Sequence, residues 1–315
     1  MAGPPLVTGA SGFAGSHLVE HLLEREAEVA AWCSPRANPS TADDTRVHWR
    51  AVDLLDCRAV CEAIAELRPS VVYHCAGAAD VGTSWADPVT PLRVNALGTH
   101  HLLDALRTAG STATVVVAGS ATVYRITSDP LIEDAPLGPS SPYGVSKLAQ
   151  EMIAWRETSF PVVLARPFNH AGPRQSPAFV TSSFARQIAE IEAGRAEPVL
   201  SVGNLDARRD ITDVRDTVRA YRLLAEKGQP RRPYNVCSGR AYRIGDLLEL
   251  LLGRANRSIA VAIDQDRLRP SDQPVILGDP SRARAEIGWR PAVAIEDTLT
   301  DLLDHWRRQV ALLQA

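Results

Sequence analysis

Two side chains four residues apart indicate what this chain can catalyse. The stretch SPYGVSK contains Tyr143 and Lys147, which a helix would place one turn apart on the same face. A phenol has an ordinary pKa of about 10, too high for a base at neutral pH, but a neighbouring ammonium favours the phenolate and lowers that pKa. In the reverse direction the same phenol donates a proton. Ser120, at the carboxyl end of a predicted strand, would hydrogen-bond the oxygen atom that gains or loses that proton.

A second stretch offers two competing chemistries. Residues 8–21 read TGASGFAGSHLVEH: the first eight have the form of a phosphate-binding turn, and the last five have the H-x-x-E-H spacing of some zinc hydrolases. His17 and His21 could share one helix face with Glu20 between them, but no downstream acidic helix stands out as the third ligand. We therefore expect no metal site here, and we expect both histidines near the solvent edge.

The glycine turn is the stronger of the two signals. Gly9, Gly12 and Gly15 follow an apolar strand and open a helix, which is the context that dinucleotide binding requires. Gly9 would allow the tight turn, Gly12 the close approach of a diphosphate to the helix amino end, and Gly15 the packing of helix on strand. The predicted contacts of the dinucleotide in this turn are Gly9, Ser11, Gly12, Phe13, Ala14 and Gly15.

The second strand indicates which dinucleotide is bound. An NAD site usually has an acid about 20 residues beyond the glycines, to accept hydrogen bonds from the ribose. Here the strand ends in WCSPRAN, with no acid before Asp43, whereas Ser34 and Arg36 could hold a 2′-phosphate. NADP(H) is favoured and NAD(H) remains possible, the alternative for Arg36 being an exposed loop arginine. Asp53 and Leu54, after the third strand, would lie beside the adenine.

The elements that must position these residues alternate between strand and helix. Six short apolar strands, at about 6–8, 28–33, 47–52, 70–76, 114–120 and 161–166, are separated by helical patterns. This order predicts an α/β fold of the Rossmann type, a doubly wound parallel sheet formed by residues 1–166. Residues 167–315 are less regular and predict a smaller C-terminal α/β substrate lobe, with some segments returning to the sheet.

Composition excludes several classes of function. The net charge of −3 gives no basic field for nucleic acid, and no apolar run reaches the roughly 18 residues that span a bilayer. The start of the chain has no basic region like that of a signal peptide, and the five cysteines contain no C-x-x-C pair. We expect a cytoplasmic enzyme with reduced thiols, no metal, and no membrane or nucleic-acid partner.

Four motifs together resemble the extended short-chain dehydrogenases/reductases that act on nucleotide sugars. They are TGASGFAG, GSATVY, YGVSK and RPFNHAGP, and the resemblance covers nearly the whole chain. It implies that Tyr143 is the acid/base, that Lys147 holds the nicotinamide ribose and tunes Tyr143, and that Ser120 orients the sugar oxygen. Ala76 and Gly77 stand where the family has small residues beside the cofactor.

Within that class the second half is similar to the GDP-4-keto-6-deoxy-D-mannose reductases. The similar stretches include FNHAGPRQSPAFVTSSFARQI, VGNLDARRDITDVRD and RLRPSDQP. The resemblance implies a nucleotide-sugar site in which Asn169 contacts the sugar or diphosphate and Val180 lies near the base. It further implies phosphate contacts from Arg186 and Arg209, and ribose contacts from Arg269 and Asp272.

The segment after Ser120 separates the possible reactions. Dehydratases of this class carry an acid there, but here Ala121 and the substrate-facing Thr122 fill those places, so elimination is disfavoured. The main hypothesis is therefore reduction of the C4 ketone of a GDP-4-keto-6-deoxyhexose. Because GSATVY is similar to the segment of UDP-galactose 4-epimerases, an epimerase is the alternative, and a non-catalytic dinucleotide sensor is a third hypothesis.

The resemblance also implies a homodimer. In this family, helices such as those predicted near 90–109 and 143–157 often form a four-helix bundle between two subunits. Their alanine- and leucine-rich faces permit such a bundle, although the same faces could be wholly internal.

Overall fold

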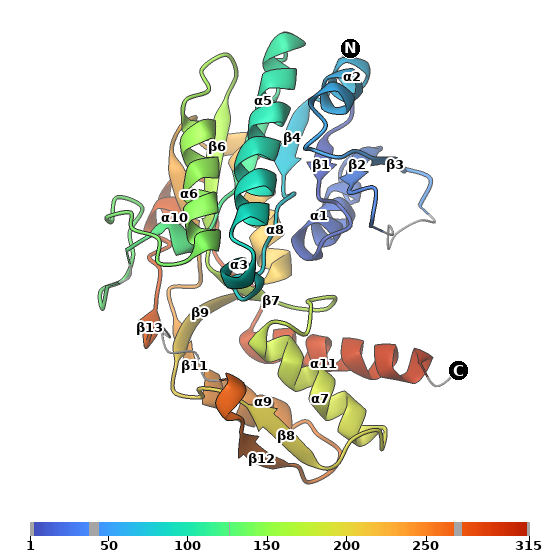
Figure 1. The fold of residues 1–315 in the computed structure, drawn as a ribbon, viewed down its shortest axis with the longest axis vertical. Helices are drawn as coiled ribbons and strands as arrows, with labels where there is room; N and C mark the ends of the chain where they lie inside the picture. Colours follow the sequence, from blue (N-terminus) through green and yellow to red (C-terminus); the bar gives the residue numbers. More distant parts are fainter. Residues whose placement is uncertain (1–2, 38–43, 126, 268–272, 314–315) are drawn as a thin grey trace.

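A seven-stranded sheet forms the centre of the molecule. The computed structural model describes residues 3–37, 44–125, 127–267 and 273–313. The strands of the sheet are β1 (Leu6–Thr8), β2 (Val29–Cys33), β3 (Val47–Ala51), β4 (Val71–His74), β5 (Thr114–Ala118), β6 (Val162–Pro167) and β10 (Pro233–Val236). Their order is β10-β6-β5-β4-β1-β2-β3, and every neighbouring pair is parallel (Figure 1). The predicted Rossmann-type fold class is thereby confirmed.

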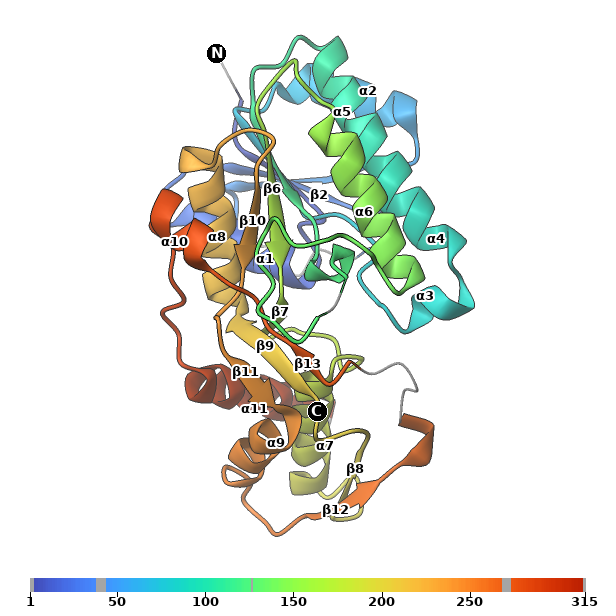
Figure 2. The ribbon, with the colours of Figure 1, turned by 90° about the vertical axis from the view of Figure 1, so that its left-hand side faces the viewer.

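Helices cover both faces of this sheet. One face carries α1 (Phe13–Leu23) and α8 (Val214–Lys227), and the other carries α2 (Cys57–Leu67), α5 (Gly98–Thr108) and α6 (Pro142–Trp155) (Figure 2). Leu18, Val19 and Leu22 of α1 are buried against the sheet because the helical repeat places them on one face. Helix α2 begins where the Asp56 carboxylate caps it by accepting from the Ala59 amide at 3.0 Å.

The helix predicted near 90–109 contains an irregular turn. Two short helical segments, α3 (Thr83–Ala86) and α4 (Val89–Pro91), lead into a π-helical turn, η1 (Leu92–Leu97), which continues directly into α5. Asn95 in this turn is fully buried. π-Helical turns are rare and occur often at functional sites. Because this turn packs against α6, it indicates a functional region near that helix.

A smaller lobe follows β6 and has its own core. Figure 1 shows it below the sheet, and β6 leads into it directly at the carboxyl edge. Its interior is formed by apolar side chains such as Phe184, Ile188, Leu248 and Leu299. Its strands are β7 (Asn169–Ala171), β8 (Val199–Val202), β9 (Arg208–Asp213), β11 (Ala241–Arg243), β12 (Ala260–Ile263) and β13 (Val275–Ile276), and its main helices are α7 (Val180–Glu192), α9 (Ile244–Leu252) and α11 (Ile295–Leu312).

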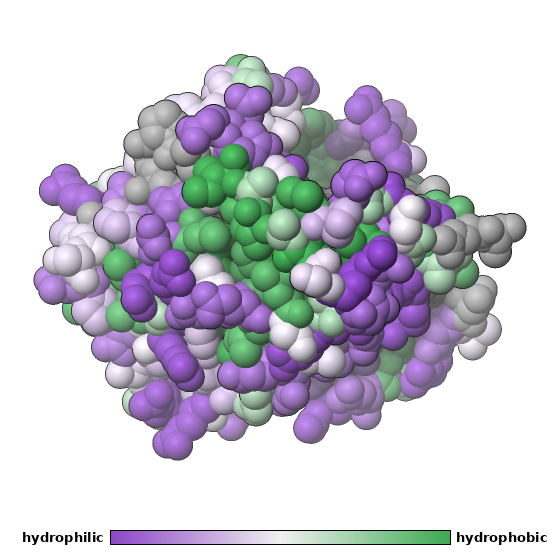
Figure 3. All heavy atoms as spheres, turned by 90° about the horizontal axis from the view of Figure 1, so that it is seen from below, coloured by the Kyte–Doolittle hydropathy of each residue, from purple (hydrophilic) through white to green (hydrophobic). Residues whose placement is uncertain are grey.

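The strands of the lobe form two small sheets. In the first sheet β9 pairs with β7, β11 and β13. In the second, β8 and β12 pair with each other in parallel. Figure 3 shows an apolar area on the face seen from below, the end of the molecule where these two strands lie, and Val199, Val261 and Ile263 are exposed on them.

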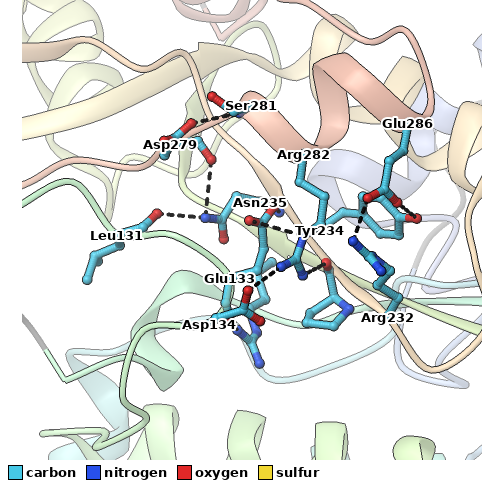
Figure 4. A network of polar contacts seen from close by, with 12 residues as sticks. Leu131, Glu133, Asp134, Arg232, Tyr234, Asn235, Asp279, Ser281, Arg282 and Glu286 are labelled. Carbon is cyan, nitrogen blue, oxygen red and sulfur yellow. Dashed lines mark hydrogen bonds and ion pairs between the residues drawn. The ribbon is translucent and has the colours of Figure 1, made fainter.

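Segments beyond residue 167 return to the main sheet. Strand β10 pairs with β6, and the short helix α10 (Ser281–Glu286) packs against β10. Figure 4 shows the polar contacts that hold this return: Arg282 contacts Glu133 and Asp134, and the Asn235 side-chain amide donates to the Leu131 carbonyl at 2.7 Å. The loop before α6 is therefore tied to the C-terminal part of the chain. The division at residue 166 stays a prediction.

A fully buried ion pair lies beneath this loop. Arg166 at the end of β6 and Glu151 on α6 are 2% and 3% exposed, and the Arg166 Nε donates to Glu151 at 2.9 Å. The same guanidinium donates to the Tyr124 hydroxyl at 2.9 Å and to the Glu133 carbonyl at 2.8 Å. Since every partner of Arg166 is itself buried, this pair links β6, α6 and the loop.

We predict that Arg166→Met lowers the free energy of unfolding by about 3–5 kcal/mol, because it leaves the Glu151 carboxylate buried without its cation. Urea unfolding followed by circular dichroism measures this change. Arg58→Met is the matched control: it breaks an exposed pair with Glu62 and should change the stability far less, because water screens that pair. An Arg166→Met protein as stable as the Arg58→Met control would contradict the assigned role.

Candidate active site

The glycine turn joins β1 to α1 at the carboxyl edge of the sheet. Gly9 has a φ of +68°, and a Cβ there would lie 2.6 Å from the Ala76 Cα. A Cβ at Gly15 would lie 2.1 Å from the Gly9 carbonyl oxygen. No side chain caps α1, whose cap residue is Gly12. The first amide groups of α1 therefore remain available to an anion, beside the partly exposed Ser11, Phe13 and Ala14.

This turn lies next to the switch point of the sheet. Strand β1 pairs with β2 on one side and with β4 on the other, so the connections from its neighbours run to opposite faces. Ligands of open parallel sheets bind at the carboxyl ends of the strands at such a point. The turn therefore fits the diphosphate of a dinucleotide.

The three residues of the H-x-x-E-H motif, His17, Glu20 and His21, each have a partner elsewhere in the chain. The Glu20 carboxylate pairs with Arg174, and the His17 Nε2 donates to the Pro173 carbonyl at 2.9 Å. His21 Nε2 accepts from Arg222 at 3.1 Å. The expectation that both histidines lie near the solvent edge is wrong for His17, which is buried because the loop after β7 covers it.

The candidates for the adenosine half of the cofactor follow β2 and β3. Ser34 and Arg36 are exposed after β2, and the Arg36 amide donates to the Ser34 hydroxyl at 3.3 Å. Asp53 is exposed and accepts from the Leu55 amide at 2.9 Å, whereas Leu54 is buried. The guanidinium of Arg36 is thus presented to solvent beside the same edge as the glycine turn.

Helix α6 carries the catalytic candidates. The Ser141 hydroxyl caps it by accepting from the Gly144 amide at 3.0 Å, and Pro142 occupies its first turn. This start places Tyr143 and Lys147 one turn apart, and both side chains are buried.

Ser120 brings a hydroxyl against Tyr143. Its Oγ accepts from the Thr122 amide at 3.1 Å and from the Thr122 hydroxyl at 2.9 Å. Since both of these are donations to Ser120, its own hydrogen is free for the Tyr143 oxygen, with which it forms a hydrogen bond. Burial raises the pKa of Tyr143 to about 12, and the hydrogen bond from Ser120 opposes that rise. The expectation that Lys147 lowers the Tyr143 pKa below its ordinary value is therefore wrong for this structure, because burial outweighs it, and Tyr143 is a neutral proton donor at pH 7.

Lys147 is held from two sides. Its Nζ donates to the Ala118 carbonyl at the end of β5 at 2.9 Å and to the Gln150 Oε1 at 2.8 Å. Burial lowers the pKa of Lys147 to about 8. The amine also lies beside the cofactor candidates after β4, because a Cβ at Gly77 would be 3.3 Å from Nζ.

The structure adds polar residues that the sequence reasoning missed. Asn95 of the π-helical turn accepts from the Ala78 amide at 2.8 Å and donates to Ser146 on α6 at 2.9 Å. The Ser84 hydroxyl accepts from the Tyr143 amide at 3.3 Å. The sequence signal that could have identified them is that Ser84, Asn95 and Ser146 are polar residues within otherwise apolar helical patterns. These residues hold α6 against the loop that follows β4.

The predicted substrate residues lie in the lobe. Asn169 is exposed and stands opposite Ile211 of β9 in the β7–β9 pairing, two positions from Arg209 on that strand. The Arg209 guanidinium donates to the Gln273 carbonyl at 2.7 Å. Val180 is exposed at the start of α7. The predicted ribose contacts, Arg269 and Asp272, lie outside the described residues.

Arg186 lies further along α7. It pairs with Glu190 at 2.8 Å, and its guanidinium lies 5.7 Å from the centre of the Trp306 ring. A hollow of about 370 Å³ is lined there by both members of this pair, together with Pro177, Ala178, Ser183, Gln187 and Arg267. The catalytic candidates thus meet at the sheet edge, whereas Arg186 already has an acidic partner on its own helix.

Three further properties concern the described residues as a set. Within it, no group of three histidine, cysteine or acidic side chains is arranged to hold a metal ion. None of its helices combines the length and apolar character needed to cross a bilayer. All five cysteines are free thiols.

The family model for GDP-mannose 4,6 dehydratase matches residues 6–302. The GDP-6-deoxy-D-mannose reductase of Pseudomonas aeruginosa is 36% identical over 310 residues, which cover 96% of this chain and 97% of the relative.

Solved structures agree with this likeness. The structure of RMD from Pseudomonas aeruginosa complexed with NADPH has a TM-score of 0.86 and 34% identity, covering 98% of this chain and 100% of that one. The Thermus thermophilus UDP-glucose 4-epimerase, solved in complex with NAD, has a TM-score of 0.84 and 30% identity, covering 96% and 99% of the two chains. With the glycine turn and the Ser120–Tyr143–Lys147 cluster in place, the chain belongs to the GDP-mannose 4,6 dehydratase family, within the extended short-chain dehydrogenases/reductases.

Proposed function

We propose that this chain is an NADPH-dependent reductase of the C4 ketone of a GDP-4-keto-6-deoxyhexose. The observation that carries the proposal is the arrangement of the buried Tyr143 phenol beside the Ser120 hydroxyl, with the buried Lys147 one turn further along α6. A ketone reduction needs a proton donor at the carbonyl oxygen, and this cluster supplies one. The identity of 36% to a reductase named for a GDP-linked 6-deoxy sugar supports the substrate class.

In the proposed reaction the hydroxyls of Ser120 and Tyr143 both donate to the carbonyl oxygen of the substrate. Tyr143 then releases its proton to that oxygen as negative charge develops on it, a contribution of typically 10²–10⁴-fold for a positioned acid. A bound reduced nicotinamide would supply the hydride. The Lys147 ammonium favours the resulting phenolate and would also bind the nicotinamide ribose.

The segment after Ser120 supports reduction over elimination. Ala121 has no acidic group, and the Thr122 hydroxyl already donates to Ser120 at 2.9 Å. A dehydratase must protonate a leaving hydroxyl, and a threonine in that hydrogen bond is a poor source of the proton. The likeness to the Thermus thermophilus epimerase supports the alternative, a nucleotide-sugar 4-epimerase.

The cofactor preference rests on the end of β2. The exposed Arg36 guanidinium and the Ser34 hydroxyl can accept a 2′-phosphate, and the relative from Pseudomonas aeruginosa was solved with NADPH. We therefore propose NADP(H) as the preferred cofactor, with NAD(H) as the alternative. The amide groups at the start of α1 would hold the diphosphate, and Asp53 and Leu54 would lie beside the adenine.

The lobe is proposed to hold the nucleotide sugar. Asn169 begins β7, two residues after β6 ends at the carboxyl edge of the sheet, and Arg209 lies on β9, which pairs with β7. These two residues, with Val180 at the start of α7, would contact a substrate whose sugar reaches Tyr143. To bind a phosphate, Arg186 would need to release its ion pair with Glu190.

A cytoplasmic location remains a prediction.

A second copy of the chain is proposed to cover the outer face of α5 and α6, which lie side by side (Figure 2). Val145 and Met152 are seven residues apart on α6 and 46% and 61% exposed, which gives an apolar stripe along the helix. Further large exposed apolar side chains are Trp155 on α6 and, on the neighbouring helical segments, Trp85, Val89, Leu92 and Leu97. Because isologous contact between two such pairs of helices forms a four-helix bundle, we propose a homodimer.

Tyr143→Phe should reduce kcat by about 10²–10⁴-fold, because the proton donor is lost while the ring remains. The assay uses GDP-, UDP- and dTDP-linked 4-keto and 4-hydroxy sugars, with NADPH followed by absorbance and products by NMR. Tyr73→Phe, at a buried tyrosine in the core on the opposite face of the sheet, is the control and should retain activity.

Net NADPH oxidation with a GDP-4-keto sugar supports the reductase. Interconversion of 4-hydroxy sugars without net change of nicotinamide supports the epimerase instead. Activity of Tyr143→Phe equal to that of the unchanged chain, or no turnover of any sugar, would contradict the proposed role and favour a dinucleotide sensor.

Arg36→Ala should weaken NADPH binding about 10- to 100-fold and leave NADH binding unchanged, because only the 2′-phosphate loses a charged hydrogen-bond donor. Isothermal titration of both dinucleotides measures this difference. Arg25→Ala, an exposed arginine beyond the far end of α1, is the control. Equal losses for NADPH and NADH would remove Arg36 from the 2′-phosphate site.

Met152→Glu should dissociate the dimer, because it places a charge within the apolar stripe. Light scattering should give the mass of two chains for the unchanged protein and of one chain for the variant at the same concentration. Leu312→Glu changes a residue that is 69% exposed on α11 and should leave the mass at two chains. A single-chain mass for the unchanged protein would refute the dimer.

A further inference from the structure

The environment of Lys147 raises a question about its charge. The side chain is 6% exposed, and no carboxylate among the described residues forms an ion pair with it. Its two acceptors are the Ala118 carbonyl at 2.9 Å and the Gln150 side-chain oxygen at 2.8 Å. A backbone carbonyl can only accept, whereas an amide side chain can present either its oxygen or its NH2 group. The Lys147 ammonium therefore has its second acceptor only if other contacts hold the Gln150 oxygen toward it.

The other end of the Gln150 amide contacts Thr99. The Gln150 Nε2 lies 2.9 Å from the Thr99 hydroxyl oxygen, and that hydroxyl lies 2.6 Å from the Asn95 carbonyl oxygen. Because the Asn95 carbonyl cannot donate, the single hydroxyl hydrogen of Thr99 must point at it. The Thr99 oxygen can then only accept from its remaining partners.

One of those partners is the buried His74. Its Nε2 lies 2.7 Å from the Thr99 oxygen, so Nε2 must carry the ring hydrogen. Burial lowers the pKa of His74 to about 3, so the ring is neutral and has one hydrogen only. Its Nδ1 consequently accepts from the Thr8 hydroxyl at 2.8 Å, just before the glycine turn. Each hydrogen bond in the series has a single allowed direction.

We infer that Gln150 is a positioning residue for Lys147, its amide being oriented by the buried series Thr8–His74–Thr99. If the amide were reversed, its NH2 group would face the ammonium and its oxygen would face a Thr99 hydroxyl that has no hydrogen left to give. The series thus presents an acceptor, and never a donor, to Lys147. This deepens the proposed function, on which it rests for the role of Lys147 beside Tyr143.

The charge of Lys147 should depend on this acceptor. Glu151, one turn further along α6, has its carboxylate paired with Arg166. The other titratable groups near Lys147 in the described residues are His74 on β4, Cys75 just after β4, Tyr143 on the same helix, and Tyr221 of α8. All four are neutral near pH 7, since burial lowers the pKa of His74 and raises that of Cys75 to about 12, with those of both tyrosines raised as well. Hydrogen bonds to Ala118 and Gln150 are therefore the local contacts that favour the ammonium over the amine.

The chain allows a direct measurement, because Lys147 and Lys227 are its only lysines. Labelling with [13C]lysine gives two side-chain signals, and the exposed Lys227 supplies the reference. Titration of the full chain without ligands reports the acid dissociation constant of Lys147, and Lys147→Arg assigns its signal. Neither substrate nor cofactor is needed, so a failure here is distinguishable from failure of the reductase activity.

Gln150→Leu should increase the acid dissociation constant of the Lys147 ammonium about tenfold or more, because an acceptor to the charged form is removed. Gln150→Glu should decrease it, because a carboxylate then faces the ammonium. Thr99→Val should shift it in the same direction as Gln150→Leu by freeing the amide to turn, and Thr99→Ser should restore the value of the unchanged chain. Nitrogen NMR of His74 should show hydrogen on Nε2.

Two results would overturn the inference. One is a Lys147 titration that is the same in folded Gln150→Leu and in the unchanged chain. The other is a His74 ring with its hydrogen on Nδ1, since this would reverse the series. If Gln150→Leu does not fold, Gln150→Glu and Thr99→Val decide in the same way, because an unchanged titration in both would refute the role of the amide.

Discussion

Burial of the Lys147 ammonium is the constraint on which the rest of the active site depends. A charge taken out of water is tolerated only where hydrogen-bond acceptors replace the water. Here the acceptors are the Ala118 carbonyl at the end of β5 and the Gln150 side chain on α6. The strand and the helix together therefore fix the position of the Lys147 amine. Because Tyr143 lies one turn earlier on the same helix, these contacts also set the phenol against Ser120.

The parts of the fold that depend on local pattern could be predicted from the sequence. The glycine turn followed from its spacing together with its place between an apolar strand and a helix, and Gly9 and Gly15 stand where no Cβ fits. Residues 167–315 were expected to return to the sheet in some segments, but the neighbour of β10 is β6, which lies far earlier in the chain, and local pattern does not choose between distant partners. His17 was misjudged for the same reason: the carbonyl that covers it belongs to Pro173.

The candidate site divides in the same way. Tyr143 and Lys147 share one helix, so their spacing, together with Ser120 at the end of a predicted strand, indicated the pair. Gln150 is only three residues further on, but its significance depends on Thr99, which lies on another helix, and on His74 in the sheet. Such contacts depend on how α5 and α6 pack over β4, which residue spacing does not contain. For the same reason, the lobe's arginines were identified by resemblance, and the contact of Arg186 with Glu190 was not foreseen.

The central claim is that Tyr143 and Lys147 act beside a nicotinamide whose diphosphate lies at the amino end of α1. A crystal structure of the full chain with NADP+ and GDP tests this most directly. We expect the diphosphate on the first amide groups of α1, the Lys147 amine at the nicotinamide ribose, and the Tyr143 hydroxyl facing the nicotinamide. A diphosphate bound away from α1, or a Tyr143 hydroxyl turned away from the ring, would contradict the claim.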